Sequence, residues 1–149
     1  MNSRDDSVIE VLYALRALGD ALDRMHGAMG DDMDMNQTDL RALRMMVERE
    51  RSGEVVSPHD LARHLRISTA STSKMLDRLE ASGHLERRPH PSDRRARIVV
   101  LTPHSKQTFF AHFGAHLARM SEVTRDLSLD ERRVVASFLS RMAETIDPR

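Results

Sequence analysis

The stretch SPHDLARHLRISTASTSKMLDRLEASGHLERRPHPSDRRARIVVLT, residues 57–102 of 149, decides the fold that we predict for this chain. Ser57 is a typical helix N-cap, and Pro58 after it suits the first position of a short helix. Ser68 caps a second helix, which ends at Gly83 because glycine tolerates the backbone that closes a helix. Two helices separated by so short a break form a helix-turn-helix, and the second helix of this motif enters the major groove of DNA by its N-terminal end.

A basic hairpin follows the second helix. Residues 84–88 and 97–101 are expected to form its two strands, and residues 89–96 between them are polar, interrupted by proline and basic. A basic hairpin beside a helix-turn-helix is a wing, whose tip can place arginine in the narrow minor groove, where the negative potential is strongest. We therefore predict a mainly α-helical chain with a small β-hairpin wing, an α+β winged helix-turn-helix.

Long helices are expected on both sides of residues 36–102. Apolar residues recur at helical spacing through residues 8–29, and Ser128 with Glu131 matches the capping box of a last helix. The apolar stripe that we expect this last helix to bury comprises Val134, Val135, Phe138, Leu139 and Met142. A chain of this length cannot cover all these stripes by itself, so we prefer a homodimer to a monomeric bundle. The dimer would place its two recognition helices about 34 Å apart, one helical turn of DNA.

The predicted organisation is one domain that spans the whole chain. Its parts are a helical dimerisation region, residues 1–35 and 103–149, and a winged helix-turn-helix DNA-binding region, residues 36–102.

Charge is distributed unevenly along the chain, although its formal net charge is zero. Residues 63–98 carry nine Lys or Arg against four Asp or Glu, whereas residues 1–35 carry three against eight. A basic middle and an acidic end fit a protein that presents one face to double-stranded DNA.

Composition excludes several classes of protein. The chain has no cysteine, which rules out disulfides and thiol redox sensing, and its six glycines form no phosphate-binding loop, so we do not expect an enzyme. No apolar run approaches a membrane span and no signal-peptide core is present, which predicts a cytoplasmic protein without a membrane partner. A winged helix used for protein–protein contact is the more distant alternative, because such domains usually lose the basic wing and recognition face.

Several short segments carry a resemblance to a known family: Asp60-Leu61-Ala62 with Leu65, Ile67-Ser68, residues 75–80 with Gly83, Asp93-Arg94-Arg95, and Leu101-Thr102. Over essentially its whole length the chain resembles the MarR-type winged-helix transcriptional regulators. The resemblance implies a ligand-responsive homodimeric repressor that binds a pseudo-palindromic operator. Arg66 stands in the turn where helix-turn-helix proteins often have glycine, so we expect that turn not to be left-handed.

The predicted DNA-binding residues are Ser68, Thr69, Ser71, Thr72, Ser73, Lys74, Arg78, Arg87, Arg88, His90, Asp93, Arg94, Arg95 and Arg97. Hydroxyls at the start of the recognition helix can reach base edges or phosphates, and the strand arginines can follow the DNA backbone. Arg94 and Arg95 are the wing-tip candidates, and Asp93 is expected to orient one of them by a charge-assisted hydrogen bond. Arg78 either contacts DNA or pairs with a neighbouring carboxylate, and His90 either contacts the backbone or is merely exposed.

No cofactor is expected, but two effector hypotheses stay open. In the family that the chain resembles, ligands commonly bind between the helical dimerisation region and the winged helix-turn-helix region. Methionines in residues 25–35 would suit a small apolar or aromatic effector there, or they simply fill the core.

The second effector hypothesis is a zinc-responsive regulator of the same fold. His112 and His116 stand four apart on one helix face, as in many zinc sites, although zinc needs three or four ligands. Asp39 matches an acidic position of a zinc-responsive branch that the chain resembles. The cysteine of that branch is absent, so His26 or Asp31 would have to replace it.

Overall fold

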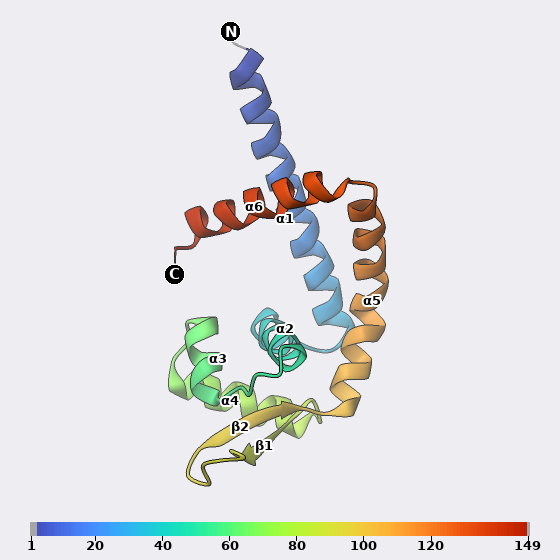
Figure 1. Cartoon of the computed structure of the whole chain (residues 1–149). Coiled ribbons are helices and arrows are strands. Elements are labelled where there is room, and N and C mark those ends of the chain that lie inside the picture. The colour runs from blue at the N-terminus through green and yellow to red at the C-terminus, as the bar shows by residue number, and fades with distance from the viewer. Residues whose placement is uncertain (1–2, 149) are drawn as a thin grey trace. The chain divides into compact units, whose positions relative to one another are not determined.

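The chain folds into helices and one hairpin, as predicted (Figure 1). The computed structural model describes the backbone of residues 3–148 and the side chains of residues 5–148. The elements are α1 (Ser3–Asp32), α2 (Gln37–Arg51), α3 (Pro58–Leu65), α4 (Thr69–Ala81), β1 (Leu85–Pro89), β2 (Arg97–Leu101), α5 (Pro103–Arg125) and α6 (Leu129–Ile146). They form two compact units, Met1–Phe109 and Phe110–Arg149. The first unit holds the helix-turn-helix and the wing.

Local hydrogen bonds start the helices where the sequence predicts. Ser57 Oγ accepts from the backbone N–H of Asp60 at 3.1 Å, and Asp60 Oδ2 accepts from the backbone N–H of Ser57 at 2.9 Å. The hydrogen bond from this Ser57 N–H lowers the pKa of the Asp60 carboxyl. Ser128 and Glu131 make the same reciprocal pair at the start of α6. A cap of this kind stabilises a helix by about 1 kcal/mol, which makes the boundary a local property of the sequence.

The turn between α3 and α4 differs from the prediction, because Arg66 is left-handed with φ 55° and ψ 45°. The backbone N–H of Ile67 donates to the oxygen of Ala62 at 3.2 Å, and that of Arg66 donates to the oxygen of Arg63 at 3.3 Å. This is the Schellman pattern, which requires a left-handed residue just after the helix. Its hydrogen bonds offset the cost of about 1–2 kcal/mol that a non-glycine residue meets in this conformation.

The core of the first unit lies between α2, α3, α4 and the wing. Its largest fully buried apolar side chains are Leu40, Leu43, Met46, Leu61, Met75, Leu76, Leu79, Leu85 and Val56. The helical spacing of Leu61 and Leu65, and of Met75, Leu76 and Leu79, predicts one buried face for each helix of the helix-turn-helix, and both faces are buried. Because α4 buries one face here, its opposite face is turned outward.

The hairpin is anchored at its base to α2 and to the segment after it. Strand β1 begins one residue later than predicted, because the backbone N–H of His84 closes the end of α4 on the oxygen of Leu79 at 2.9 Å. Val99 of β2 donates its backbone N–H to the oxygen of Val56 at 2.8 Å. The backbone N–H of Leu101 donates to Oε1 of Glu50 at 3.1 Å. These bonds hold the wing on the helix-turn-helix core.

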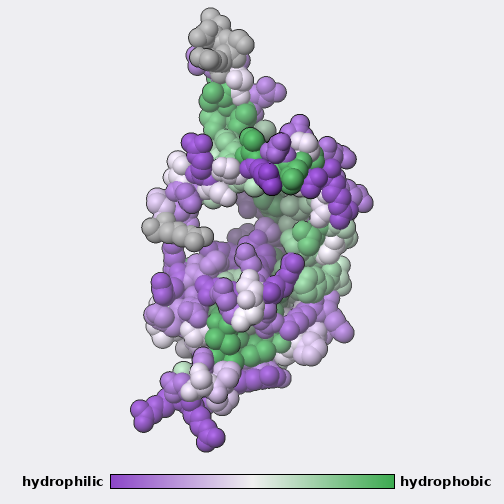
Figure 2. All heavy atoms as spheres, viewed as in Figure 1, coloured by the Kyte–Doolittle hydropathy of each residue, from purple (hydrophilic) through white to green (hydrophobic). Residues whose placement is uncertain are grey.

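Helices α1 and α6 keep exposed apolar side chains. In α1, Val8 is 57% exposed, and Figure 2 shows apolar side chains along the first half of this helix. In α6, Val134 is 68% exposed and no residue is buried, so the single chain leaves this apolar stripe uncovered, as expected for so short a chain. The second unit offers only α5 and α6, which are too few helices to enclose an apolar stripe. None of the helices within residues 3–148 is long and apolar enough to cross a membrane.

A buried histidine makes the stability of the first unit depend on pH. His84 is buried beside Ser105, whose Oγ lies 3.3 Å from its Nδ1. Burial lowers the pKa of His84 below its ordinary value of 6.5, and the nearby His104 lowers it further, while Asp39 acts in the opposite direction. Folding therefore favours the neutral ring, so the stability that depends on this ring is complete above pH 6.5 and is lost as the pH falls toward the lowered pKa.

We expect the free energy of unfolding to fall as the pH drops below 6.5, in urea titrations that follow helical circular dichroism. The variant His84→Gln should lose part of this dependence, because glutamine does not titrate. The same pH dependence in the variant as in the parent would show that His84 is not responsible.

Candidate nucleic-acid interface

The outward face of α4 is polar, small and basic. Its exposed residues in the first two turns and at the cap are Ser68, Thr69, Ala70, Ser71, Ser73 and Lys74. Ser68 Oγ accepts from the backbone N–H of Ser71 at 3.0 Å and donates to Ser71 Oγ at 3.0 Å, so the cap holds these two hydroxyls together. A helix start with this surface can approach base edges and phosphates closely.

Thr72 does not belong to this face, which corrects the prediction that it contacts DNA. It is 2% exposed, and its hydroxyl donates to the backbone oxygen of Ser68 at 2.9 Å. The helical repeat places Thr72 one turn before the buried Leu76 and Met75, on the core side of α4. The same repeat brings Ala70 outward in line with Ser73, and sequence reasoning missed it. The Ala70 methyl group can touch a thymine methyl group.

Arg78 pairs with a distant carboxylate instead of the carboxylates of its own helix. Its guanidinium donates to Asp39 on α2 through Nε at 3.2 Å and through Nη2 at 2.5 Å. The Asp39 side chain is only 4% exposed, and the hydrogen bond to it raises the pKa of Arg78. The pairing with a carboxylate of its own helix is therefore wrong, because α2 and α4 meet only in the folded chain, whereas a DNA contact by the 49% exposed side chain of Arg78 stays a prediction. The pair ties the start of α2 to the recognition helix.

The wing tip carries arginines that are not used within the protein. Arg94, Arg95 and Arg97 are exposed, and their side chains make no ion pair or hydrogen bond with any residue that the structure describes. Figure 2 shows hydrophilic side chains projecting from the end of the hairpin. Such cations at the end of a wing can enter a minor groove or bind phosphates.

The side chains of Asp93 and His90 accept hydrogen bonds from the backbone of the wing tip. Asp93 Oδ1 accepts from the backbone N–H of Arg95 at 3.0 Å, so it orders the turn and does not hold a guanidinium as predicted. The short distance along the chain favours this backbone contact, which an Asp side chain makes readily in turns. His90 Nδ1 accepts from the backbone N–H of Ser92 at 3.1 Å. Both residues therefore act on the backbone that presents the arginines.

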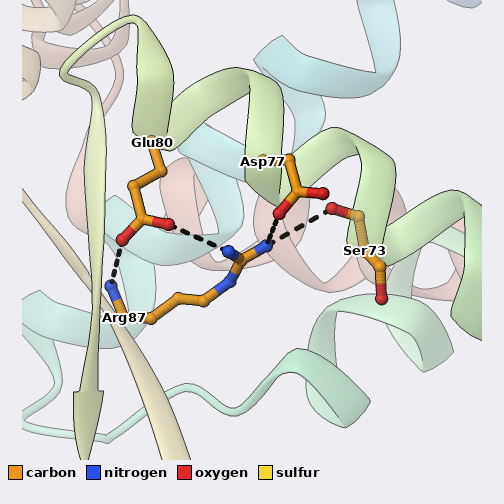
Figure 3. Close-up of polar contacts among 4 residues, drawn as sticks. All are labelled: Ser73, Asp77, Glu80 and Arg87. Carbon is orange, nitrogen blue, oxygen red and sulfur yellow. Dashed lines mark hydrogen bonds and ion pairs between the residues drawn. The ribbon is translucent and has the colours of Figure 1, made fainter.

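The two neighbouring arginines of β1 are held by carboxylates. Arg87 lies against α4, where its guanidinium contacts Asp77 at 2.6 Å and Glu80 at 2.9 Å (Figure 3). The prediction that Arg87 follows the DNA backbone is therefore not supported by its position. Arg88 pairs with Glu86 at 2.6 Å and stays exposed.

The zinc candidates are divided between the two units, with Asp39 and His26 in the first and His112 and His116 in the second. No group of three or more His, Cys, Asp or Glu that could hold a metal ion occurs among the described residues. Asp39 is engaged by Arg78, and His26 Nε2 lies 2.7 Å from Nη1 of Arg44, which donates to it. Burial and Arg44 both lower the pKa of His26. His112 and His116 are half-buried on α5 of the second unit.

The first unit thus defines a winged helix-turn-helix DNA-binding protein, with a recognition helix whose polar face is outward and a wing tipped by arginines. A model of the MarR family matches residues 33–96. This segment is therefore similar to the MarR family of transcriptional regulators, as its sequence indicated, and the relatives that match the chain are named as transcriptional regulators.

Similar proteins also match parts of the chain outside residues 33–96. It is 25% identical to the HTH-type transcriptional regulator YcgE of Bacillus subtilis over 146 residues, which cover 98% of this chain and 92% of that protein. It is 30% identical to the multiple antibiotic resistance protein MarR of Salmonella typhimurium over 90 residues, or 58% of this chain and 61% of that protein. A mutant of MepR from S. aureus has the same fold, with a TM-score of 0.74 at 16% identity over 92% of this chain and 97% of that chain.

Proposed function

We propose that this regulator is a homodimeric repressor that binds a pseudo-palindromic operator with two copies of α4 and two wings, and that a small aromatic effector releases it. The observation that carries the proposal is the pairing of a polar, outward recognition face with a basic wing tip on one unit. Each such unit can cover only one half-site, so a twofold operator requires two copies. A repressor that acts on chromosomal DNA in this way works in the cytoplasm.

The exposed apolar side chains of α1 and α6 support the dimer. Val8 and Leu12 follow one another at helical spacing on α1, as do Val135, Phe138 and Leu139 on α6, and all of them are exposed. Contiguous apolar surface of this kind is rare on a monomer and typical of a subunit interface. Removing it from water stabilises association by about 25 cal/mol for each Å² of apolar area buried.

Two similar proteins support a DNA-binding repressor that responds to an effector. A crystal structure of MepR, which has the same fold, contains ethidium bromide, and another, of a MepR mutant, contains an oligodeoxyribonucleotide. A further relative, YetL of Bacillus subtilis, is named a transcriptional repressor. In this chain Met29, Met33 and Met35 are all buried near the junction of α1 and α2, so their flexible side chains fill the core there unless a ligand displaces them.

The proposal is tested by selecting duplexes from a randomised DNA pool with the whole protein. We expect a pseudo-palindromic site that binds two protomers, with affinity falling about a thousandfold or more between about 50 and 200 mM salt as counterions are released. Stoichiometry from analytical ultracentrifugation and affinity from fluorescence anisotropy give both quantities. Selection of no sequence, or of a single half-site bound by one protomer, would contradict the proposal.

A further inference from the structure

Two carboxylates lie on the side of the recognition helix that borders the wing. Asp77 and Glu80 are one helical turn apart on α4, and both are exposed. DNA is a polyanion, so carboxylates beside a helix that enters its groove oppose the approach unless a cation compensates them. One side chain, that of Arg87 on β1, contacts both.

The Arg87 guanidinium lies between strand and helix, and both of its terminal nitrogens are engaged (Figure 3). Nη2 donates to Asp77 Oδ1 at 2.6 Å and to the backbone oxygen of Ser73 at 3.3 Å, and Nη1 donates to Glu80 Oε2 at 2.9 Å. Glu80 also holds the strand itself, because its Oε1 accepts from the backbone N–H of Arg87 at 3.3 Å. These contacts join β1 to the recognition helix from Ser73 to Glu80, which is about two helical turns.

Arg88, the next residue of the strand, shows how Arg87 differs from an ordinary surface arginine. Successive side chains of a strand lie on opposite faces, and among the described residues Arg88 pairs only with Glu86, two residues before it. The side chain of Arg88 is 57% exposed, whereas that of Arg87 is 29% exposed. A bidentate phosphate contact needs two donors on one edge of the guanidinium, and in Arg87 the terminal donors already serve α4.

We propose that Arg87 is a positioning residue for DNA binding, which sets the wing against the recognition helix and compensates Asp77 and Glu80 without contacting DNA itself. The inference rests on DNA binding through α4 and the wing. Because the contacts of Arg87 span Ser73 to Glu80, rotation of the wing about the recognition helix would break at least one of them. The tip arginines are thereby kept at a set distance from the residues that enter the major groove.

The test compares substitutions at Arg87 on the duplex that the unaltered protein selects. Arg87→Met should weaken binding by about tenfold or more, because two uncompensated carboxylates then face DNA. The slope of log affinity against log salt should stay the same, since the same phosphates are still neutralised. Adding Asp77→Asn and Glu80→Gln to Arg87→Met should restore most of the affinity. Arg51→Met, on the exposed side of α2, is the matched control for removal of one charge.

A phosphate contact by Arg87 gives the opposite results. The salt slope would then fall by about 0.9 in Arg87→Met, as we expect for Arg94→Met at the wing tip, and neutralising the two acids would not restore binding. The variant Arg87→Lys distinguishes a positioning role from a phosphate contact even if Arg87→Met folds poorly. Lysine binds phosphate well but cannot bridge two carboxylates, so retained affinity in Arg87→Lys would overturn the inference. Failure of the unaltered protein to select any duplex would instead count against the proposed function.

Discussion

Replacing Arg94 and Arg95 together by alanine is expected to weaken operator binding by about a hundredfold or more while the protein stays folded. Each arginine that reaches a groove or phosphates contributes about 1–3 kcal/mol to binding, and both side chains are exposed and unpaired among the described residues. The salt dependence should also weaken, with the slope of log affinity against log salt falling by about 0.9 for each phosphate that is no longer neutralised. Fluorescence anisotropy over a salt series measures both quantities.

The double variant Arg41→Ala, Arg51→Ala is the control for the wing-tip experiment. It removes the same charge from the exposed side of α2 and should change affinity by less than about fivefold, the effect of net charge alone. Circular dichroism should show unchanged helix content in both double variants, because none of the four side chains is buried. Equal reductions of affinity in the two would mean that the wing contributes charge without touching DNA.

Replacing Phe138 by glutamate on α6 is expected to convert the proposed dimer to a monomer and to abolish specific operator binding. A carboxylate buried in an apolar interface without a partner costs several kcal/mol, and one such group is placed on each side of a twofold contact. A monomer reaches only one half-site, so its affinity should fall by about a thousandfold or more toward the non-specific level. Sedimentation velocity gives the oligomeric state and anisotropy gives the affinity.

Ser140→Glu is the matched control, since it adds the same charge to the same helix. Ser140 is exposed and stands two residues from Phe138, on the opposite side of α6. It should leave the dimer and the operator affinity unchanged. A Phe138→Glu protein that remains dimeric would show that the stripe of α6 is not the interface, and one that loses helix content would show that the stripe packs within the single chain.

Local features of the fold could be read from the sequence. Ser57, Ser68 and Ser128 cap helices through bonds to residues only three positions away, and these boundaries were predicted correctly. The hairpin was displaced by one residue only, because His84 is drawn into the end of α4 by a bond to Leu79. The helical repeat could also have shown that Thr72 faces the core, since it shares the face of the predicted core residues Met75, Leu76 and Leu79.

The candidate site was predicted less well where its contacts cross between elements. Arg78 and Asp39 are 39 positions apart, and nothing in the spacing of their residues indicates that α2 and α4 meet there. Arg87 was predicted to follow DNA because its charge is visible in the sequence, whereas the carboxylates that engage it come from another element. Asp93 was assigned to a guanidinium although a backbone N–H two residues away was within its reach.

The sequence by itself determined where the capping serines start helices, that a basic hairpin follows the recognition helix, and that the chain resembles the MarR-type regulators. These properties depend on caps, periodicity and turn residues, whose interactions reach about four positions along the chain. Only the tertiary structure decided which cations stay available to DNA. Arg78 and Arg87 are engaged by carboxylates that folding brings to them. Arg94 and Arg95 stay available because Asp93 accepts from a backbone N–H of the tip, and no carboxylate among the described residues pairs with their side chains.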